Sequence, residues 1–301
     1  MLEISHVSKN FGRVRVLHDV TFDVKDGSSC LLIGSNGAGK TTLIKSIVGL
    51  LNFSGEIRVD GLDARSDGKR ARERIGYVPQ AFNFYDKLAV EEEANLMARL
   101  KGLSAASTKG SLQLMGLWDA RRRRVGELSH GMRQRLAVAL GLINDPPLLI
   151  FDEPLSSIDL KGRLDFESMM RRLAKMGKTL LISTHLPGLS GSVEQTVVID
   201  SGRVVAGGSP RDLLAGLGSK DKVYLKLPNS AKDQAKQALE DLKFDVKTEG
   251  EWLLISADPA LKSQIIDAMT ERGFEIQDII IEPSTIESEY VNLIGDRGRD
   301  V

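Results

Sequence analysis

The sequence predicts an α/β fold built around a mostly parallel sheet, followed by a small α+β unit. Three short apolar runs, at residues 30–33, 148–151 and 179–183, are typical of buried parallel strands. Helical spacing of apolar residues between the last two runs predicts the crossover helix that parallel strands need. After residue 219 the pattern follows the order β-α-β-β-α-β, which predicts a ferredoxin-like unit.

The N-terminal segment alternates between apolar and polar residues, as at Val20, Phe22 and Val24, and a turn signal follows at Asp26-Gly27. This alternation has the period of a strand with one buried face. It predicts short antiparallel strands, which together form an antiparallel β subdomain.

The remaining elements follow from the spacing of apolar residues. The strand at 30–33 leads into a glycine-rich loop at 34–39 and then a helix that begins at Lys40. Residues 85–145 are mostly helical in pattern, which predicts a helical subdomain within the α/β core, and a further helix is expected at 161–176. In the last third the pattern predicts strands at 223–227, 245–248, 252–257 and 276–281, and helices at 231–242, 259–272 and 284–294.

Charge divides the chain into two parts. The 301 residues carry 41 basic and 41 acidic side chains, so the formal net charge is zero. Residues 1–219 carry 30 basic and 24 acidic residues, a net charge of +6, whereas residues 220–301 carry 11 and 17, a net charge of −6. A glycine-rich stretch at 216–219 separates the two parts. This change in composition predicts two domains, at residues 1–215 and 220–301.

Composition excludes several classes of protein. Hydrophobic residues make up 42% of the chain and charged residues 27%, close to average globular usage, which argues against a disordered or fibrous protein. The single cysteine, Cys30, cannot form an intramolecular disulfide, and no basic and apolar leader precedes the first strand, so we expect a cytoplasmic protein. No uncharged apolar run approaches the roughly 18 residues of a membrane span, which argues against a membrane channel.

Residues 34–41 match the pattern GxxxxGK followed by Thr, between a predicted strand and a predicted helix. Backbone amides of such a loop and the positive end of the helix dipole hold phosphates. Lys40 is expected to reach the β- and γ-phosphates of a nucleotide, and the Thr41 hydroxyl to bind Mg²⁺. A glycine-rich turn that merely caps a helix is the alternative. The candidate nucleotide-binding residues of this loop are Gly34, Ser35, Asn36, Gly37, Ala38, Gly39, Lys40, Thr41 and Thr42.

Two carboxylates, Asp152 and Glu153, follow directly after the apolar run at residues 148–151. The ends of parallel strands face the crevice in which ligands bind. Asp152 is therefore expected to hold Mg²⁺, directly or through water, and Glu153 to polarise the water that attacks the γ-phosphate. The alternative, a solvent-exposed Asp-Glu turn, is disfavoured by the phosphate-binding loop elsewhere in the chain.

With these motifs, the sequence resembles the nucleotide-binding subunits of ATP-binding cassette (ABC) transporters over roughly residues 1–215. Residues 128–132, Leu-Ser-His-Gly-Met, resemble the signature LSGGQ of that family, and Gln80 lies in a segment similar to its Q-loop. Residues 156–159 resemble the D-loop, and His185 resembles the switch histidine. The resemblance implies the P-loop NTPase fold of an ABC ATPase.

The resemblance implies an ATPase that works as two subunits. In the family each ATP lies between the P-loop of one subunit and the signature of the other, so Ser129 and Gly131 would contact the γ-phosphate across the interface. It also implies that His185 contacts the γ-phosphate, with a satisfied buried histidine as the alternative, and that Asp159 lies beside the nucleotide. The implied catalytic residues are Glu153, His185, Gln80 and Lys40. The implied Mg²⁺ ligands are Thr41, Gln80 and Asp152.

Some positions depart from the family pattern or have a competing explanation. Phe11 stands where the family stacks an aromatic ring on adenine, and a core residue at a strand end is the alternative. In the signature, His130 replaces Gly and Met132 replaces Gln, while Ser129 and Gly131 are retained, so an active signature is expected. We favour an exposed, tolerated residue at His130 over a pH-sensitive contact.

An aromatic segment follows Gln80, with Phe82, Phe84 and Tyr85. In the family this segment borders the groove that receives a coupling helix of the membrane subunit. We expect these rings, with Leu88, to form the apolar floor of that groove, and an ordinary core cluster is the alternative. The resemblance thus implies a homodimer, or a paired cassette, that sandwiches two ATP and is held at the inner face of the cell membrane by a separate transmembrane permease.

The competing function is a soluble ABC ATPase that acts on nucleic acid or on the ribosome. The chain has one P-loop and one signature, unlike the two-cassette members that act in translation, and it has no heptad runs or cysteine clusters like those that act on DNA. The basic run at 121–124 lacks interleaved aromatics, so no nucleic acid partner is expected. A non-hydrolysing regulatory cassette is disfavoured because Lys40, Asp152, Glu153 and His185 are all present.

Single-cassette subunits of ABC exporters often end in an accessory segment, and residues 289–293, Glu-Tyr-Val-Asn-Leu, resemble the end of such segments. We therefore expect residues 220–301 to form a C-terminal accessory domain. Because this part carries no cluster of metal ligands, a dimerisation or regulatory role is expected. The transported substrate and the identity of the permease are not specified by this chain.

Overall fold

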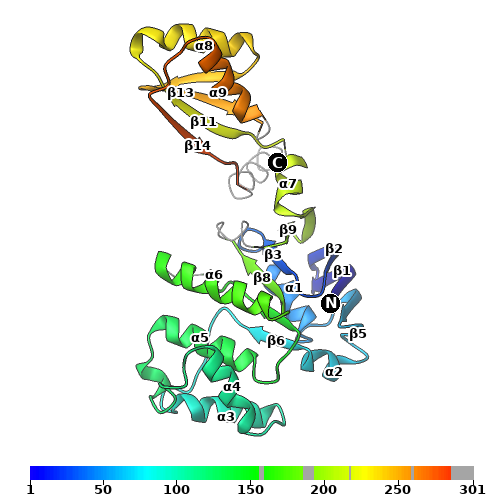
Figure 1. Ribbon diagram of the computed structural model, residues 1–301. Helices are drawn as coiled ribbons and strands as arrows, with labels where there is room; N and C mark the ends of the chain where they lie inside the picture. Colours follow the sequence, from blue (N-terminus) through cyan, green and yellow to red (C-terminus); the bar gives the residue numbers. More distant parts are fainter. Residues whose placement is uncertain (156–158, 186–192, 217, 259–260, 286–301) are drawn as a thin grey trace. The chain divides into compact units, whose positions relative to one another are not determined.

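The protein is described from a computed structural model, shown in Figure 1. The structure describes residues 1–155, 159–185, 193–216, 218–258 and 261–285. The chain divides into two compact units, Met1–Pro210 and Arg211–Val301. The division falls at the start of helix α7 (Pro210–Gly216), a few residues before the glycine-rich stretch at which the charge of the sequence changes.

A six-stranded sheet forms the centre of the first unit, in the order β10-β9-β3-β8-β7-β6. Its strands are β3 (Ser29–Ile33), β6 (Ile75–Val78), β7 (Leu148–Phe151), β8 (Thr179–Thr184), β9 (Gln195–Asp200) and β10 (Arg203–Gly208). All neighbouring strands are parallel except β9 and β10. Every side chain of β3, β7 and β8 is buried, which explains their continuous apolar runs. The carboxyl ends of β3, β6, β7 and β8 therefore meet at one edge of the sheet.

A second sheet of the first unit is antiparallel, in the order β2-β1-β4-β5. Its strands are β1 (Leu2–Phe11), β2 (Val14–Val24), β4 (Ser54–Val59) and β5 (Leu62–Asp63). β1 and β2 are longer than the short strands predicted from the sequence. Their pairing shifts register between Ile4 and Val7, where His6 has a φ of 52°. Such a bulge interrupts the alternation of apolar residues without ending the strand, so the sequence pattern breaks into shorter pieces.

The region predicted to be a helical subdomain, at residues 85–145, contains three α-helices that pack against one another (Figure 1). They are α3 (Val90–Leu100), α4 (Ala106–Leu114) and α5 (His130–Gly141), with a 3-10 turn at Val125–Glu127. The remaining helices of this unit are α1 (Lys40–Ile47), α2 (Gly68–Glu73) and α6 (Leu160–Lys175), the last being the predicted crossover helix. Among the helices in the described part of the chain, none is long and apolar enough to span a membrane.

The second unit contains a four-stranded sheet in the order β12-β13-β11-β14, in which all neighbours are antiparallel. Its elements are β11 (Asp221–Lys226), α8 (Lys232–Asp241), β12 (Asp245–Glu249), β13 (Trp252–Ala257), α9 (Lys262–Glu271) and β14 (Asp278–Glu282). This is the β-α-β-β-α-β order and the strand arrangement of a ferredoxin-like unit. The predicted helix at 284–294 falls mostly outside the described residues, and Ser284 and Thr285 are not helical.

The helices of the second unit cover one face of its sheet and enclose a separate hydrophobic core. Side chains alternate between the two faces of a strand, so alternate positions of β11 and β13 contribute to this core. Buried residues of the sheet, Val223, Leu225, Leu253 and Ile255, pack with Ala235, Leu239, Ile265 and Met269 of the two helices. The second unit therefore has a core of its own.

Candidate functional site

The candidate site lies at the shared edge of the parallel sheet where four strands end. The loop at residues 34–39 follows β3, and its first amide, Gly34 N, donates a hydrogen bond to Thr184 O at the end of β8. A Cβ at Gly34 would lie 2.5 Å from Ile199 O, so only glycine allows this close approach. Gly39, at the N-cap of α1, has a φ of 104°, which again favours glycine. The two glycines thus set the path of the loop.

Lys40 is the first residue of α1 and is almost fully buried. Its Nζ donates hydrogen bonds to Gly34 O at 2.7 Å and Ser35 O at 3.0 Å. It also forms an ion pair with Glu153 Oε1 at 3.0 Å. The loop therefore wraps around a buried ammonium group beside the free amides of a helix N-terminus, which is a favourable environment for phosphate.

Asp152 directly follows β7 and is buried among hydroxyl groups. Its Oδ1 accepts hydrogen bonds from Thr41 Oγ1 at 3.2 Å and from Ser183 Oγ at 2.9 Å. Burial raises the pKa of Asp152 above its ordinary value, although the hydrogen bonds from Ser183 and Thr41 oppose this shift. Burial and the charge of Asp152 raise the pKa of the neighbouring Tyr77 hydroxyl to about 12.

Glu153 has a backbone φ of 50°, a left-handed conformation that is uncommon for a residue other than glycine. Its N–H donates to Ser183 Oγ at 2.9 Å. His185 Nδ1 lies 2.6 Å from Glu153 Oε2, and the backbone N–H of His185 donates to the same oxygen at 3.3 Å. These contacts hold the carboxylate between Lys40 on one side and His185 on the other.

The oxygens in this cluster are suitable ligands for Mg²⁺. The Thr41 hydroxyl and the Asp152 carboxylate lie 3.2 Å apart, and hard oxygen donors of this kind suit Mg²⁺, which takes only a few protein ligands and completes its shell with water and phosphate. No group of three or more His, Cys, Asp or Glu residues suited to a metal occurs in the part of the chain that the structure describes. The Thr41 and Asp152 oxygens therefore fit a metal that takes its other ligands from phosphate and water.

Gln80 and Asp159 lie outside the hydrogen-bonded cluster. Gln80 is exposed two residues after β6, and none of its contacts in the described structure joins it to Lys40, Asp152 or Glu153. Asp159 is the N-cap of α6, where its Oδ1 accepts a hydrogen bond from Gly162 N at 2.8 Å. The rest of the predicted D-loop, residues 156–158, lies outside the described residues.

Phe11 is 47% exposed at the end of β1, so the alternative that it is a core residue is wrong. Lys9 Nζ lies 5.0 Å from the centre of its ring. The ring is therefore accessible for stacking, as an adenine contact requires.

Ser129 is the N-cap of α5, and its Oγ accepts a hydrogen bond from Met132 N at 3.3 Å. A Cβ at Gly131 would meet no atom within 4 Å, and His130 is exposed. No hydrogen bond or ion pair in the described part of the chain joins Ser129 or Gly131 to the loop at 34–39. The predicted signature therefore presents an accessible helix N-terminus that does not contact the phosphate-binding loop of the same chain.

Sequence reasoning missed two polar residues that organise the site. Ser183 Oγ donates a hydrogen bond to Asp152 and accepts one from the backbone N–H of Glu153. It was missed because it lies in an apolar run, although a hydroxyl residue near the end of a strand could have indicated a polar contact there. Gln134, on α5, is buried, and its Nε2 donates to Pro154 O at 2.9 Å. Gln134 therefore links the signature helix to the turn that carries the two carboxylates.

The aromatic segment is not an ordinary core cluster, because none of its rings is buried. The rings of Phe82 and Phe84 stack with centroids 5.6 Å apart, and Tyr85 is 63% exposed. The next residue, Asp86, accepts a hydrogen bond from Arg133 at 2.6 Å, in the first turn of α5. The segment after Gln80 is therefore joined to the signature helix.

The basic run at 121–124 is partly engaged within the protein. The Arg121 side chain stacks over Trp118 at 4.6 Å and lies 3.7 Å from a Glu91 oxygen. Arg123 donates to Glu127 O at 2.8 Å. These contacts reduce the charge that the run could offer to a nucleic acid.

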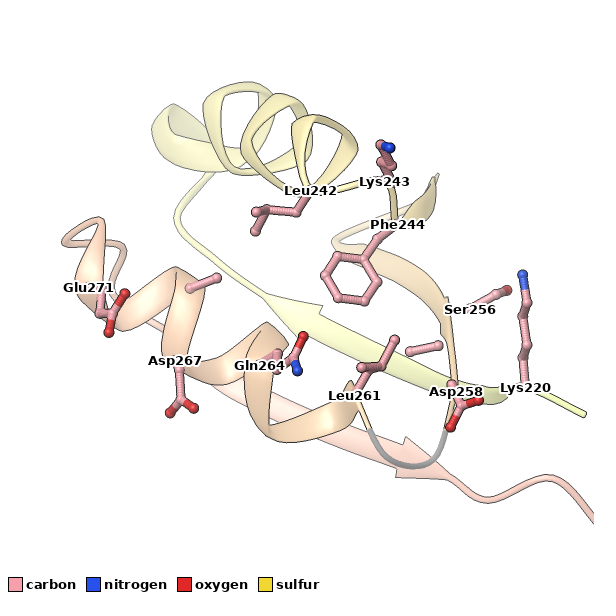
Figure 2. A pocket seen from close by; sticks show the side chains of 12 residues that line it. Lys220, Leu242, Lys243, Phe244, Ser256, Asp258, Leu261, Gln264, Asp267 and Glu271 are labelled. Atoms are coloured by element: carbon pink, nitrogen blue, oxygen red, sulfur yellow. The ribbon is translucent and has the colours of Figure 1, made fainter. Parts of the chain in front are cut away.

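A separate cavity of about 500 Å³ lies in the second unit, between the end of α8, α9 and β13 (Figure 2). Phe244 and Leu261 contribute apolar surface to it, and charged side chains such as Lys243 and Glu271 stand around it. None of the residues at the edge of the parallel sheet lines this cavity.

Comparison with known proteins gives a consistent result. The family profile described as ABC transporter matches residues 17–156. The Nod factor export ATP-binding protein I of Burkholderia lata is 35% identical over 236 residues, covering 76% of this chain and 78% of that protein. The protein of the same name from Ralstonia nicotianae is 31% identical over 311 aligned residues, covering 100% of this chain and 95% of that protein. A solved dimeric ATP-binding cassette in a post-hydrolysis state with ADP and Pi is 25% identical, with a TM-score of 0.62, covering 69% of this chain and 98% of that one.

Proposed function

This chain belongs to the ATP-binding subunits of ABC transporters, and we propose that it forms a homodimer that drives export through a separate membrane permease. As a member of this family it binds ATP and hydrolyses it to power transport. The observation that carries the proposal is the meeting of five side chains at one sheet edge: Lys40 and His185 contact Glu153, and Thr41 contacts Asp152.

Glu153 is the residue that activates water in this proposal. Its carboxylate accepts a proton from the water that attacks the γ-phosphate, and His185 keeps the carboxylate aligned through the 2.6 Å contact at Oε2. Lys40 leaves its contacts with the chain to bind the β- and γ-phosphates. Phosphoryl transfer depends mainly on positioning and on charge stabilisation, which these buried groups supply.

Thr41 and Asp152 hold Mg²⁺ in this proposal, with Gln80 as a further ligand contributed by the segment after β6. The bound ion would neutralise charge that develops on the phosphates. Ser183 supports the site by holding the Asp152 carboxylate in place. The remaining residues of the loop at 34–39, with Thr42, bind phosphates through their backbone, and Phe11 stacks on the adenine.

Each ATP binds between two copies of the chain. Ser129 and Gly131 of one copy approach the γ-phosphate held by the other copy, because their helix N-terminus is accessible. Asp159 lies at the same interface, near the nucleotide. The dimeric cassette with ADP and Pi, which is similar to this chain, supports this arrangement. ATP then joins the two copies and hydrolysis separates them.

The permease and the direction of transport are inferred from relatives and from one surface. The relatives are named for Nod factor export, which supports an exporter, and this chain would lie at the inner face of the membrane through its permease. The half-buried rings of Phe82 and Phe84 and the exposed ring of Tyr85 form the apolar floor, with Leu88, of a groove for a permease helix. The second unit acts as a C-terminal accessory domain.

The variant Glu153→Gln tests the two-copy mechanism. It removes the base but keeps the size of the side chain, so ATP and Mg²⁺ should trap a dimer, measured by multi-angle light scattering. The matched control Glu73→Gln, on the exposed side of α2, should hydrolyse ATP like the unmodified protein. A Glu153→Gln protein that binds ATP but stays monomeric at saturating ATP and Mg²⁺ would contradict the mechanism.

A further inference from the structure

The sheet of the second unit has a face that takes no part in the core of that unit. Val223, Leu225, Leu253 and Ile255 point to α8 and α9. The alternate positions of the same strands therefore form the opposite face. We call this opposite side the open face, and it consists of the twelve side chains described next.

Strand register arranges the open face in three rows across β14, β11, β13 and β12. The central row is Ile280, Tyr224, Leu254 and Lys247. One flanking row is Glu282, Lys222, Ser256 and Asp245. The other flanking row is Asp278, Lys226, Trp252 and Glu249. Ile280 is 45% exposed, the Tyr224 and Trp252 side chains are half-buried, and Leu254 is buried. The open face thus has an apolar centre with charged side chains at its margins, which is typical of a protein interaction surface.

Two neighbouring strands of this face carry opposite charges in matching positions. On β14 an isoleucine stands between two acids, and on β11 a tyrosine stands between two lysines. The two columns are Asp278, Ile280 and Glu282 on β14, and Lys226, Tyr224 and Lys222 on β11. A second copy of the same surface can therefore meet this one with unlike charges opposed and apolar groups opposed.

We propose that the β11 and β14 columns of the open face bind the same two columns of a second copy of this chain, with β11 of each copy facing β14 of the other. A two-fold axis parallel to the strands, between β11 and β14, produces this contact, and it makes the interface isologous. Each lysine then faces an acid of the second copy, and Tyr224 faces Ile280. Sheets packed face to face in this way lie about 10 Å apart.

The charge pattern disfavours the other symmetric arrangements. A two-fold axis across the strands would place Lys222 opposite Lys226 of the second copy. Antiparallel pairing of two β14 edges would place Asp278 opposite Glu282. Like charges in direct opposition destabilise strand contacts, so both arrangements are weaker than the proposed one.

The proposed contact is weak on its own. Exposed charge pairs contribute less than about 1 kcal/mol each, so most of the affinity comes from Tyr224 and Ile280, and the charges select the orientation. When two chains are already held together at another site, the effective concentration of the second contact rises to the millimolar range, and a weak interface becomes occupied. The inference concerns a surface outside the ATP site and does not depend on the proposed function.

The first test uses the chain of residues 1–301 without nucleotide, so that no ATP-dependent contact contributes. Sedimentation equilibrium at protein concentrations up to about 1 mM should show reversible dimer formation. Ile280→Asp should weaken the dimer by about tenfold or more, because it places a charge in the apolar centre. The matched control is Ile266→Asp, on the helix side of this unit and similarly exposed. This variant should leave dimer formation unchanged.

The second test exchanges charges. The variant K222E/K226E makes both strands acidic, and D278K/E282K makes both basic, so neither should dimerise alone. An equimolar mixture should associate, because the acids of one variant then face the lysines of the other. Unchanged ATP binding and thermal unfolding for each variant would establish that it is folded.

Several results would overturn the proposal. These are a monomeric unmodified protein over the whole concentration range, a normal dimer for Ile280→Asp, and a mixture of the charge variants that fails to associate. If removal of residues 286–301 turned a monomeric protein into a dimer, the tail of the same chain, and not a second copy, would be the occupant of the open face.

Discussion

Lys40 Nζ lies 3.0 Å from Glu153 Oε1, and both side chains are almost fully buried. The ammonium group is also held by the carbonyl oxygens of Gly34 and Ser35. The residue expected to bind phosphate is thus paired, within the chain, with the residue expected to activate water. A nucleotide that draws Lys40 to its phosphates would therefore change the environment of Glu153 in the same step.

Lys40→Ala should lower the affinity for ATP by roughly 10- to 100-fold, because charge-assisted hydrogen bonds contribute about 1.5–3 kcal/mol. Isothermal titration calorimetry with ATP and Mg²⁺ measures this change. Lys45→Ala, on the exposed side of the same helix, is the control and should bind ATP normally. An affinity for ATP within twofold of the unmodified protein in Lys40→Ala would rule out a phosphate contact.

His185→Ala should slow ATP hydrolysis by about 100-fold or more while ATP binding is retained. The loss of the 2.6 Å contact leaves Glu153 without the group that aligns it for proton transfer. Steady-state ATPase assays give the rate, and fluorescent nucleotide titration gives the affinity. His6→Ala, in which an exposed histidine is removed, should hydrolyse ATP at the normal rate. Equal loss of rate in both variants would contradict a specific role for His185.

Two substitutions at Ser129 separate helix capping from phosphate binding. Ser129→Ala removes the N-cap of α5 and should cost about 1 kcal/mol of stability. Ser129→Asp keeps a good N-cap, so thermal unfolding should be near normal, but its charge should repel the γ-phosphate and prevent ATP-dependent dimers. Light scattering with ATP and Mg²⁺ in the Glu153→Gln background measures the dimer. Normal dimers in the Ser129→Asp protein would exclude the proposed contact.

Asp221 predicts a pH dependence for the stability of the second unit. This buried carboxylate pairs with Lys262 and accepts hydrogen bonds from Ser284 N at 2.7 Å and Ser284 Oγ at 3.0 Å. Burial raises its pKa, but the contacts with Lys262 and Ser284 outweigh this and lower the pKa below its ordinary value. Its stabilising contribution is therefore complete above the ordinary carboxyl pKa and is lost as the pH falls through the lowered pKa of the folded state.

Asp221→Asn should destabilise the second unit by about 1–3 kcal/mol near pH 7, with a smaller difference in acid. Urea unfolding followed by Trp252 fluorescence, in a Trp118→Phe background, reports on this unit. Asp267→Asn, on the exposed side of α9, is the control. A difference in the free energy of unfolding that grows as the pH falls would contradict the assigned sign.

Agreement between sequence and structure differs from one part of the site to another. The strand, loop and helix around Lys40 were predictable because the glycines and the helical spacing are neighbours in the chain. The accessibility of the Phe11 ring could not be predicted, since a phenylalanine at a strand end can be buried or exposed. Its 47% exposure depends on which residues pack over β1. Ser183 was missed because only its position beside β7 gives its hydroxyl a partner.

The local elements, the phosphate-binding loop and the family follow from the sequence alone, because these depend on residues close together in the chain. Which distant groups meet depends on the folded structure. Parallel pairing of β3 with β8, and of β8 with β7, brings Thr41, Ser183 and Asp152 into contact, although long stretches of sequence separate them. Which strands become neighbours is set by the burial of the whole sheet, and no local pattern of residues encodes it.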